Sequence, residues 1–249
     1  YEGFDEHSVP VGDMSFRHIY STANQVQSWL ESLDTSRLFL FFHNFDMHWK
    51  NVYDGYQNPY EPGDVEFMVF SKNTYEEGMF GPEAFDGLQG AAIIDAHNKG
   101  QIELPERHQE AIALMYDDCI RMVDETLHEF FGLLKQQGRY DNALIIVTAD
   151  HGEALNDHGI YGHRSVFEPD CHVPLLVKFP DGAFAGTRFT PQVETTDLFA
   201  TILDVLGIPE DPVRDGHSLL RILRGEVAPR TYTHIAREND YASRTNEMK

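Results

Sequence analysis

The sequence predicts an α/β fold in which a mostly parallel sheet is flanked by helices. Three short apolar runs, each of strand length, alternate with segments whose apolar residues recur every three or four positions. This alternation of strand and helix patterns is typical of α/β domains. A chain of 249 residues with 41% hydrophobic residues is long enough to bury a sizeable core, as one large domain or two small ones.

The first elements that the sequence predicts are a helix and a buried strand. Thr22 can cap a helix over 23–33, because a threonine hydroxyl accepts a hydrogen bond from the first helical turn. Its apolar face carries Val26, Trp29, Leu30 and Leu33. The continuous apolar run Leu38–Phe42 indicates a strand that is buried on both faces. Residues 50–105 are rich in Gly, Pro, Asn, Tyr and acids, so we expect a variable excursion over the surface, with short helices.

A long amphipathic helix and a second strand follow. Apolar residues step by three and four between 112 and 134, the period of a helix with one apolar face. They are Ile112, Met115, Cys119, Val123, Leu127, Phe130 and Leu134. Gly138 ends this helix, and the apolar run Ala143–Val147 predicts the next buried strand.

The last predicted elements are a strand over Val173–Val177 and a helix that Thr195 or Thr196 caps. Gly207 and Pro209 close this helix. Its apolar residues are Leu198, Ile202, Val205 and Leu206. We expect the three strands to be neighbours at the centre of one sheet.

The charge balance excludes two classes of partner. Nineteen Lys and Arg against 41 Asp and Glu give 19 − 41 = −22, a charge that repels nucleic acid and anionic membranes. No apolar stretch approaches the roughly 18 residues of a membrane span, so we expect none. Two cysteines cannot build a disulfide framework, and Cys119, on the apolar helix face, is expected to be buried and inert.

The segment from Thr148 to His163 carries the chemistry. Asp150 and His151 follow the Ala143–Val147 strand directly, and residues placed there lie where open α/β sheets have their active sites. Three glycines allow tight turns around a bound group: Gly152, Gly159 and Gly162. An Asp-His pair alone is more often part of a polar loop after a strand, but the whole segment favours a metal-dependent hydrolase.

Several segments of the chain resemble the sulfatases of the alkaline phosphatase superfamily. The resemblance is carried by 113–124, 134–142, Ile146-Val-Thr-Ala-Asp-His-Gly-Glu153, 172–177, 196–209 and Asp215-Gly-His-Ser-Leu-Leu220. It extends over about 21–224, with 50–105 the least similar part. It implies an alkaline-phosphatase-like three-layer α/β/α sandwich, in which 1–249 form a sulfatase-like domain that is part of a larger catalytic domain.

The resemblance also assigns roles to residues. It implies that Asp150 and His151 bind the family's divalent cation, usually calcium, for which a carboxylate is a suitable ligand. It places His163 and His48 where relatives have residues that contact the sulfate or the leaving-group oxygen. We expect these four residues to converge on one site. We expect His158 and His43 to be structural, or to contact the site residues without contacting the substrate.

The sequence departs from the family at the nucleophile. The family has Cys or Ser in a Cys/Ser-x-Pro-x-Arg motif, which neither Cys119-Ile-Arg-Met nor Cys171-His-Val-Pro matches. Ser8-Val-Pro-Val-Gly12 has Gly where the Arg belongs. The amino-terminal Asp pair of the metal site is also not found. We therefore expect this chain to be inactive alone and to need a missing amino-terminal half or another subunit.

The resemblance implies a sulfuric ester hydrolase that acts on a small-molecule or glycan sulfate ester. An alternative within the superfamily is a phosphatase, phosphodiesterase or phosphoethanolamine-type transferase with a Thr or Ser nucleophile. A third possibility, from another class, is a non-catalytic sulfatase-like module kept for binding.

Overall fold

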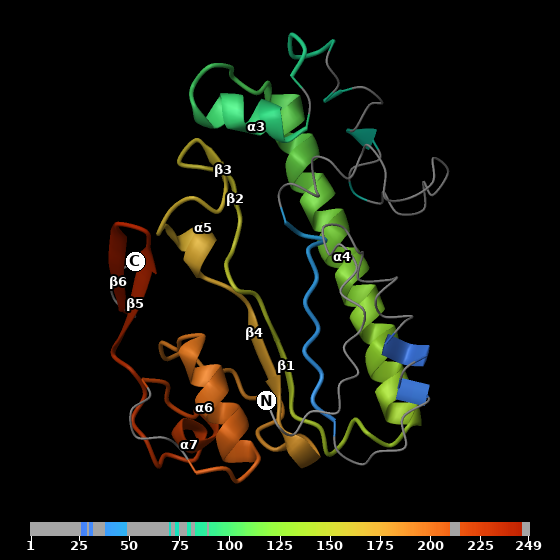
Figure 1. Cartoon of the computed structure of the whole chain (residues 1–249), viewed down its shortest axis with the longest axis vertical. Helices are drawn as coiled ribbons and strands as arrows, with labels where there is room; N and C mark the ends of the chain where they lie inside the picture. Colours follow the sequence, from blue (N-terminus) through green and yellow to red (C-terminus); the bar gives the residue numbers. More distant parts are fainter. Residues whose placement is uncertain are drawn as a thin grey trace, which may run out of the picture. The chain divides into compact units, whose positions relative to one another are not determined.

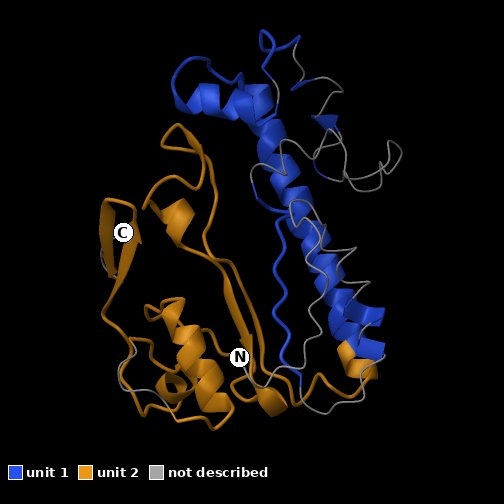
Figure 2. Cartoon of the chain, in the orientation of Figure 1, with its two compact units in different colours: residues 1–133 blue, residues 134–249 orange. Residues whose placement is uncertain are grey.

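The computed structural model describes residues 26–28, 30–31, 38–48, 70, 73–74, 79–80, 83–88, 90–209 and 215–245. Its chain divides into two compact units, unit 1 (residues 1–133) and unit 2 (residues 134–249), which are coloured separately in Figure 2. No helix in these described ranges is long and apolar enough to cross a membrane. The prediction of a single sulfatase-like domain stays a prediction.

Unit 1 is organised around a long helix. Helix α3 spans Ala91–Asn98, and α4 spans Glu106–Gln136, as Figure 1 shows. Helix α4 confirms the predicted amphipathic helix, and Gly138, with φ of 66°, follows its end because a glycine adopts this left-handed conformation at little cost. The buried apolar residues include Val26, Leu30, Ile93, Ile94, Leu104, Ile112 and Met115.

The predicted strand at Leu38–Phe42 is wrong for the described chain. Residues 38–45 are assigned to no strand, and Phe39 and Phe41 are exposed. Phe42 instead packs against Met122 and Val123 of α4. Phe42 thus packs on the helix while Phe39 and Phe41 are exposed, so the run is not buried on both faces.

Unit 2 contains the other described elements. Its strands are β1 (Ile145–Thr148), β2 (Ala154–Asp157), β3 (Ile160–Gly162), β4 (Leu175–Lys178), β5 (Tyr232–Arg237) and β6 (Asp240–Thr245). Its helices are α5 (Glu168–Cys171), α6 (Thr196–Val205) and α7 (Leu219–Leu223), with a 3-10 turn η4 at Pro180–Gly182.

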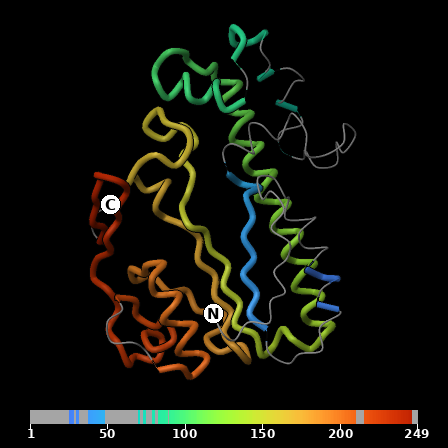
Figure 3. Tube along the Cα trace, in the orientation of Figure 1, coloured from blue at the N-terminus to red at the C-terminus, as the bar shows by residue number. Residues whose placement is uncertain are grey.

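The strand pairs in the described residues are all antiparallel, so none of these pairs shows the parallel arrangement that predominates in the expected sheet. Strand β1 pairs with β4, β2 with β3, and β5 with β6. A parallel pair needs a crossover, usually a helix that runs back along the strands. The chain between β1 and β4 carries only the β2–β3 hairpin and the four-residue α5, so it returns antiparallel, as Figure 3 traces.

The bounds of β1 and β4 are shifted from the predicted runs for identifiable reasons. Strand β4 begins after Pro174, which has no N–H to donate to a ladder. Ala143, before β1, donates its N–H to Tyr140 in a turn. One face of β4 packs with α6 and α7 around Phe179, whereas Leu176 is exposed. These strands are therefore not buried on both faces.

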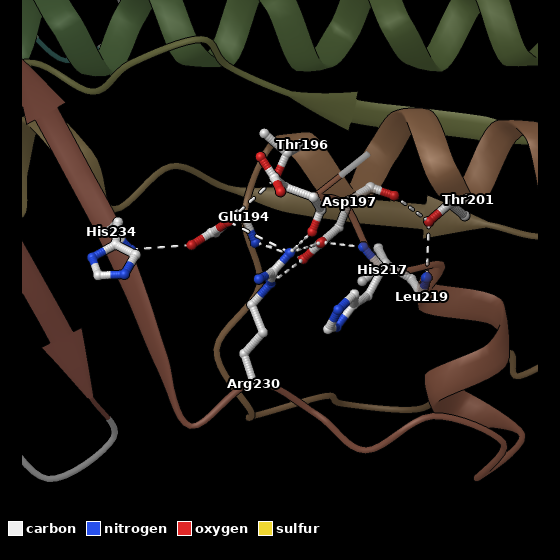
Figure 4. Close-up of polar contacts among 9 residues, drawn as sticks. Glu194, Thr196, Asp197, Thr201, His217, Leu219, Arg230 and His234 are labelled. Carbon is white, nitrogen blue, oxygen red and sulfur yellow. Dashed lines mark hydrogen bonds and ion pairs between the residues drawn. The ribbon is translucent and has the colours of Figure 1, made fainter. Parts of the chain in front are cut away.

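A buried ion pair holds α6, the chain before α7 and the chain before β5 together (Figure 4). The Asp197 side chain is fully buried, and Arg230 donates to its Oδ1 at 2.8 Å. Asp197 also accepts from the backbone N–H of His217 at 2.7 Å and of Glu194 at 2.9 Å. These three donated hydrogen bonds, one of them from a cation, thus compensate the desolvation of this carboxylate.

The predicted cap of α6 is wrong. Thr195 already has helical angles, φ −60° and ψ −26°, and its side chain makes no cap bond. The Asp197 carboxylate instead accepts the N–H of Glu194, which lies before the helix, so it ties the preceding chain to the first turn of α6. Ser218, in contrast, does cap α7 through the N–H of Arg221, and its hydroxyl donates to Asp204 of α6 at 2.7 Å.

Candidate functional site

The loop after β1 presents Asp150 and His151, as the sequence predicted. Thr148, at the end of β1, donates its hydroxyl to the Pro174 carbonyl beside β4 at 2.8 Å. His151 then donates its backbone N–H to Asp150 Oδ1 at 3.1 Å. The Asp150 side chain is 68% exposed, so the strand pair delivers a carboxylate to solvent, where an ion or substrate can reach it.

Gly152 fixes this loop against α5. Its N–H donates to the Asp170 carbonyl at 2.8 Å, and a Cβ at this position would lie only 1.9 Å from the Pro169 carbonyl oxygen. Only glycine allows so close a backbone approach. Asp170 is itself buried and accepts the N–H and hydroxyl of Ser165, both at 2.7 Å. The hydrogen bond and close packing of Gly152 thus hold the chain that carries Asp150 and His151 against α5.

The orientation of the His151 ring suits a metal ligand. Its Nδ1 lies 2.9 Å from the Gly152 carbonyl oxygen, and because a carbonyl only accepts, Nδ1 carries the proton. This contact fixes the tautomer in which Nε2 keeps a lone pair. Nε2 lies 3.8 Å from Asp150 Oδ1, close enough for one cation with bonds of roughly 2.0–2.6 Å to contact both atoms.

His163 stands beside this pair. It follows β3, and its ring stacks on that of His151 with centroids 3.8 Å apart and planes 30° apart. Its Nδ1 lies 3.2 Å from Glu153 Oε1. The structure thus brings Asp150, His151 and His163 together, while their chemical roles stay predictions.

His48 lies in unit 1, in the turn Asp46–His48. Its backbone N–H donates to the Phe45 carbonyl at 3.0 Å, and its ring centroid is 6.2 Å from that of Phe45. Because each unit is described by itself, the convergence of His48 with the three residues of unit 2 stays a prediction.

Two further histidines make aromatic contacts. The His43 ring lies 4.5 Å from that of Phe45. His158 is exposed in the turn between β2 and β3, with φ of 55°, and its ring lies 4.4 Å from that of Phe167. Both arrangements agree with the structural roles that we expect.

Asp150 and His151 are the two candidate metal ligands that the described chain brings together. Across the described ranges, no group of three or more His, Cys, Asp or Glu side chains is arranged to hold a metal ion. The exposed Asp150 carboxylate and the oriented His151 ring fit a divalent cation, but calcium typically takes six to eight oxygen ligands, so these two alone make an incomplete site.

Sequence reasoning did not single out Glu153, which the structure places against His163. Its side chain is only 3% exposed. Glu153 directly precedes β2 and His163 directly follows β3, so the two residues flank the hairpin symmetrically. Their pairing depends on the register of the hairpin, which the sequence of short polar strands does not reveal.

Comparison with protein families gives one match that covers most of the chain. The family model described as Sulfatase matches residues 12–208. Arylsulfatase K of Danio rerio is 32% identical over 111 residues, which are 45% of this chain and 21% of that protein. The chain therefore spans well under two thirds of the length of this curated relative.

Solved structures support the same relationship. A phosphonate monoester hydrolase from Silicibacter pomeroyi is 28% identical, with a TM-score of 0.50, over 70% of this chain and 33% of the other. A structure in complex with its substrate D-glucosamine-2-N,6-O-disulfate has a TM-score of 0.60 at 17% identity, over 92% of this chain and 59% of the other. The second likeness concerns the fold alone, and it confirms the predicted alkaline-phosphatase-like α/β class.

Proposed function

The chain belongs to the sulfatase family, and on that premise we propose that the complete protein hydrolyses a sulfate ester, with this chain supplying part of the catalytic site. The observation that carries the proposal is the grouping of Asp150, His151 and His163 on one loop and hairpin, with the two imidazole rings stacked 3.8 Å apart. This grouping suits a substrate that carries an anionic group and a leaving oxygen. A cation at the candidate ligands can neutralise the anionic group, and the His163 imidazole beside them can donate to an oxygen.

In this proposal Asp150 and His151 hold a divalent cation, calcium. Their fit rests on the exposed carboxylate and on the Gly152 contact that directs His151 Nε2 to the metal. When bound, such a cation neutralises charge on the sulfuryl oxygens. The remaining ligands and the nucleophile come from residues other than these two.

His163 and His48 contact the substrate in this proposal. His163 donates a hydrogen bond to a sulfuryl oxygen or to the leaving oxygen, where negative charge grows in the transition state. His48 serves the same group from unit 1. Imidazole suits this task because its ordinary pKa lies near neutrality.

The substrate class that we propose is a small-molecule or glycan sulfate ester. Support comes from relatives such as the N-acetylglucosamine-6-O-sulfatase of Bacteroides thetaiotaomicron, 30% identical over 45% of this chain and 20% of that protein. The variable segment 50–105 is the region in which we expect specificity for the sugar or other alcohol to reside.

The activity of the complete protein, loaded with calcium, on a panel of sulfate esters tests this function. His163→Ala should lower kcat by about 10²–10³, the usual effect of losing one oxyanion donor, with a smaller change in KM. His158→Ala is the matched control, because His158 contacts Phe167 on the same hairpin, and it should cost clearly less. Equal, small effects of both substitutions would place the catalytic histidine elsewhere.

A second candidate is hydrolysis of a phosphonate monoester or phosphodiester. The 28% identity to a phosphonate monoester hydrolase favours it, and the same carboxylate, imidazole and cation arrangement suits phosphoryl oxygens. Activity on phosphate or phosphonate esters, with no activity on any sulfate in the panel, would establish this candidate and overturn the first.

A further inference from the structure

Helix α5 is too short to hold its own place. It has four residues, a single turn, and isolated helices of fewer than about 12 residues are marginal in water. Its position must therefore come from contacts with the rest of unit 2. This matters for the candidate site, because Gly152 donates its N–H to the Asp170 carbonyl of α5 and packs against the Pro169 carbonyl oxygen.

A charged contact from β6 anchors the start of α5. Arg244 donates from Nη2 to Glu168 Oε1 at 2.5 Å, and hydrogen bonds between charged groups are among the strong ones. The two residues are 76 positions apart in sequence, so the contact joins segments that only the fold brings together. His172 Nδ1 also lies 3.1 Å from this oxygen, but its side chain is 62% exposed, against 20% for Arg244. Arg244 is therefore the better shielded of the two partners.

These contacts form a continuous path from β6 to a candidate ligand. Arg244 holds Glu168, the first residue of α5. In the same turn, the Asp170 carbonyl accepts the Gly152 N–H at 2.8 Å. The Gly152 carbonyl oxygen in turn lies 2.9 Å from His151 Nδ1. A shift of α5 must therefore move the loop that carries this ring or break one of the hydrogen bonds.

We propose that Arg244 is a positioning residue for the candidate cation site. By holding Glu168 it fixes α5, and α5 in turn fixes the loop of Asp150 and His151. Arg244 acts only through α5 in this proposal, which rests on the cation role proposed above for Asp150 and His151.

Arg244→Met in the complete protein tests the proposal. Methionine keeps an unbranched stem but has neither the cation nor its N–H donors, so α5 should open locally more often. We expect hydrogen–deuterium exchange in a peptide over 150–154 to become about 5–10-fold faster, an effect between those of an exposed and a buried ion pair. A peptide over 216–222 is the internal reference, because Leu219 donates its buried N–H to Thr201 at 2.9 Å. Its exchange should not change.

Calcium affinity is the second measurement. Calorimetric titration should give a Kd for calcium about 3–10-fold higher in Arg244→Met, because a ligand loop that spends less time in the binding arrangement lowers the apparent affinity. Arg237→Met is the matched control, since Arg237 lies on the same hairpin and faces the exposed Glu238 at 3.7 Å. It should leave both measurements as in the wild type. Arg244→Lys, which keeps the positive charge, should recover part of the loss.

Glu168→Gln changes the other partner of the same contact. Glutamine keeps the shape and one oxygen acceptor but loses the charge, so exchange over 150–154 should rise by less than in Arg244→Met. The double variant should exchange no faster than Arg244→Met alone, because both substitutions remove one interaction. Glu168→Gln decides the proposal if Arg244→Met does not fold.

The outcomes separate this proposal from the proposed function. Unchanged exchange over 150–154 overturns the positioning role, and so does an equal rise over 216–222, which would mean that the contact stabilises the fold as a whole. Faster local exchange with an unchanged Kd for calcium also overturns it. A wild type that binds no calcium and cleaves no sulfate ester defeats the proposed function, while the exchange comparison still decides whether Arg244 holds the loop.

Discussion

At Gly152 the backbone after β1 passes so close to α5 that a single added carbon has no room. The candidate ligands Asp150 and His151 directly precede this contact, and the Gly152 carbonyl is also the group that orients the His151 ring. A residue with no side chain thus determines both where the ligand loop lies and how one ligand is turned.

Gly152→Ala should destabilise the protein by about 1–3 kcal/mol, the usual cost of overpacking, and should lower cation affinity, because either α5 or the ligand loop must move. Gly132→Ala is the control, since a Cβ there meets no atom within 4 Å, and replacing a mid-helix glycine should stabilise by about 0.5–1 kcal/mol. Urea unfolding of both variants measures the difference. A Gly152→Ala protein as stable as the wild type would contradict this packing argument.

Cys119 is the other residue with a clear physical consequence. Burial, reinforced by the carboxylates of Asp46 and Asp118, raises the pKa of its thiol from 9.0 to about 12. The thiol is therefore neutral and unreactive near neutral pH, which agrees with the inert role that the sequence predicts.

Between pH 9 and 12 the folded protein keeps the Cys119 proton while the unfolded chain releases it. The unfolded state then binds fewer protons, so the free energy of unfolding falls as pH rises through this window. Urea unfolding from pH 8 to 11 should show a steeper decline for the wild type than for Cys119→Ala. Parallel curves for the two proteins would indicate a thiol with an ordinary pKa.

Among the elements, α6 and α7 depend on one buried ion pair. Asp197 and Arg230 contact each other at 2.8 Å, and the Arg230 guanidinium also donates to the Asp215 carbonyl at 2.7 Å. Gly216 packs closely against the start of α6, since a Cβ on Gly216 would lie only 2.3 Å from the Thr196 carbonyl oxygen. The segment before α7 and the start of α6 are therefore joined by both charge and close backbone packing.

Arg230→Met should destabilise the protein by about 3–5 kcal/mol, because it leaves the buried Asp197 carboxylate without its cation. Arg237→Met is the control, since Arg237 faces the exposed Glu238 at 3.7 Å and such surface pairs contribute about 0–1 kcal/mol. Denaturant midpoints compare the two variants. A double variant Asp197→Leu, Arg230→Met should recover part of the loss, since it removes both buried charges.

The elements that were predicted correctly are those whose pattern is local. The period of Ile112 to Leu134 suffices for α4, since a helix forms from neighbours in sequence. The direction of β4 relative to β1 depends on how the intervening chain returns, which no periodicity encodes. The same holds for Glu153, whose place opposite His163 depends on one bulge at Asn156.

For the molecule as a whole, the net charge of −22 has a bearing on its proposed cation. Repulsion among the excess carboxylates opposes the compact state, and a bound divalent cation offsets part of that charge. A ligand that binds only the folded protein also stabilises it by mass action, by about 2.7 kcal/mol at a concentration 100 times its Kd.

Removal of calcium with a chelator should therefore lower the Tm of the complete protein, and Asp150→Ala should abolish the response to calcium. Asp157→Ala, which removes an equal charge from the neighbouring β2–β3 hairpin, should keep it. Differential scanning calorimetry at fixed ionic strength measures both. A calcium response that survives in Asp150→Ala would mean that this carboxylate is not a ligand.

The β2–β3 hairpin helps to set the spacing of the candidate ligand and the candidate donor. The contacts given above for His151 and His163 join residues within 150–170, so a change of register in this hairpin would move one ring relative to the other. Inserting one residue next to Tyr161 in β3, for example, would shift the ladder by one residue and send alternate side chains to the other face. Engineering of this site should therefore leave the length of the hairpin strands unchanged.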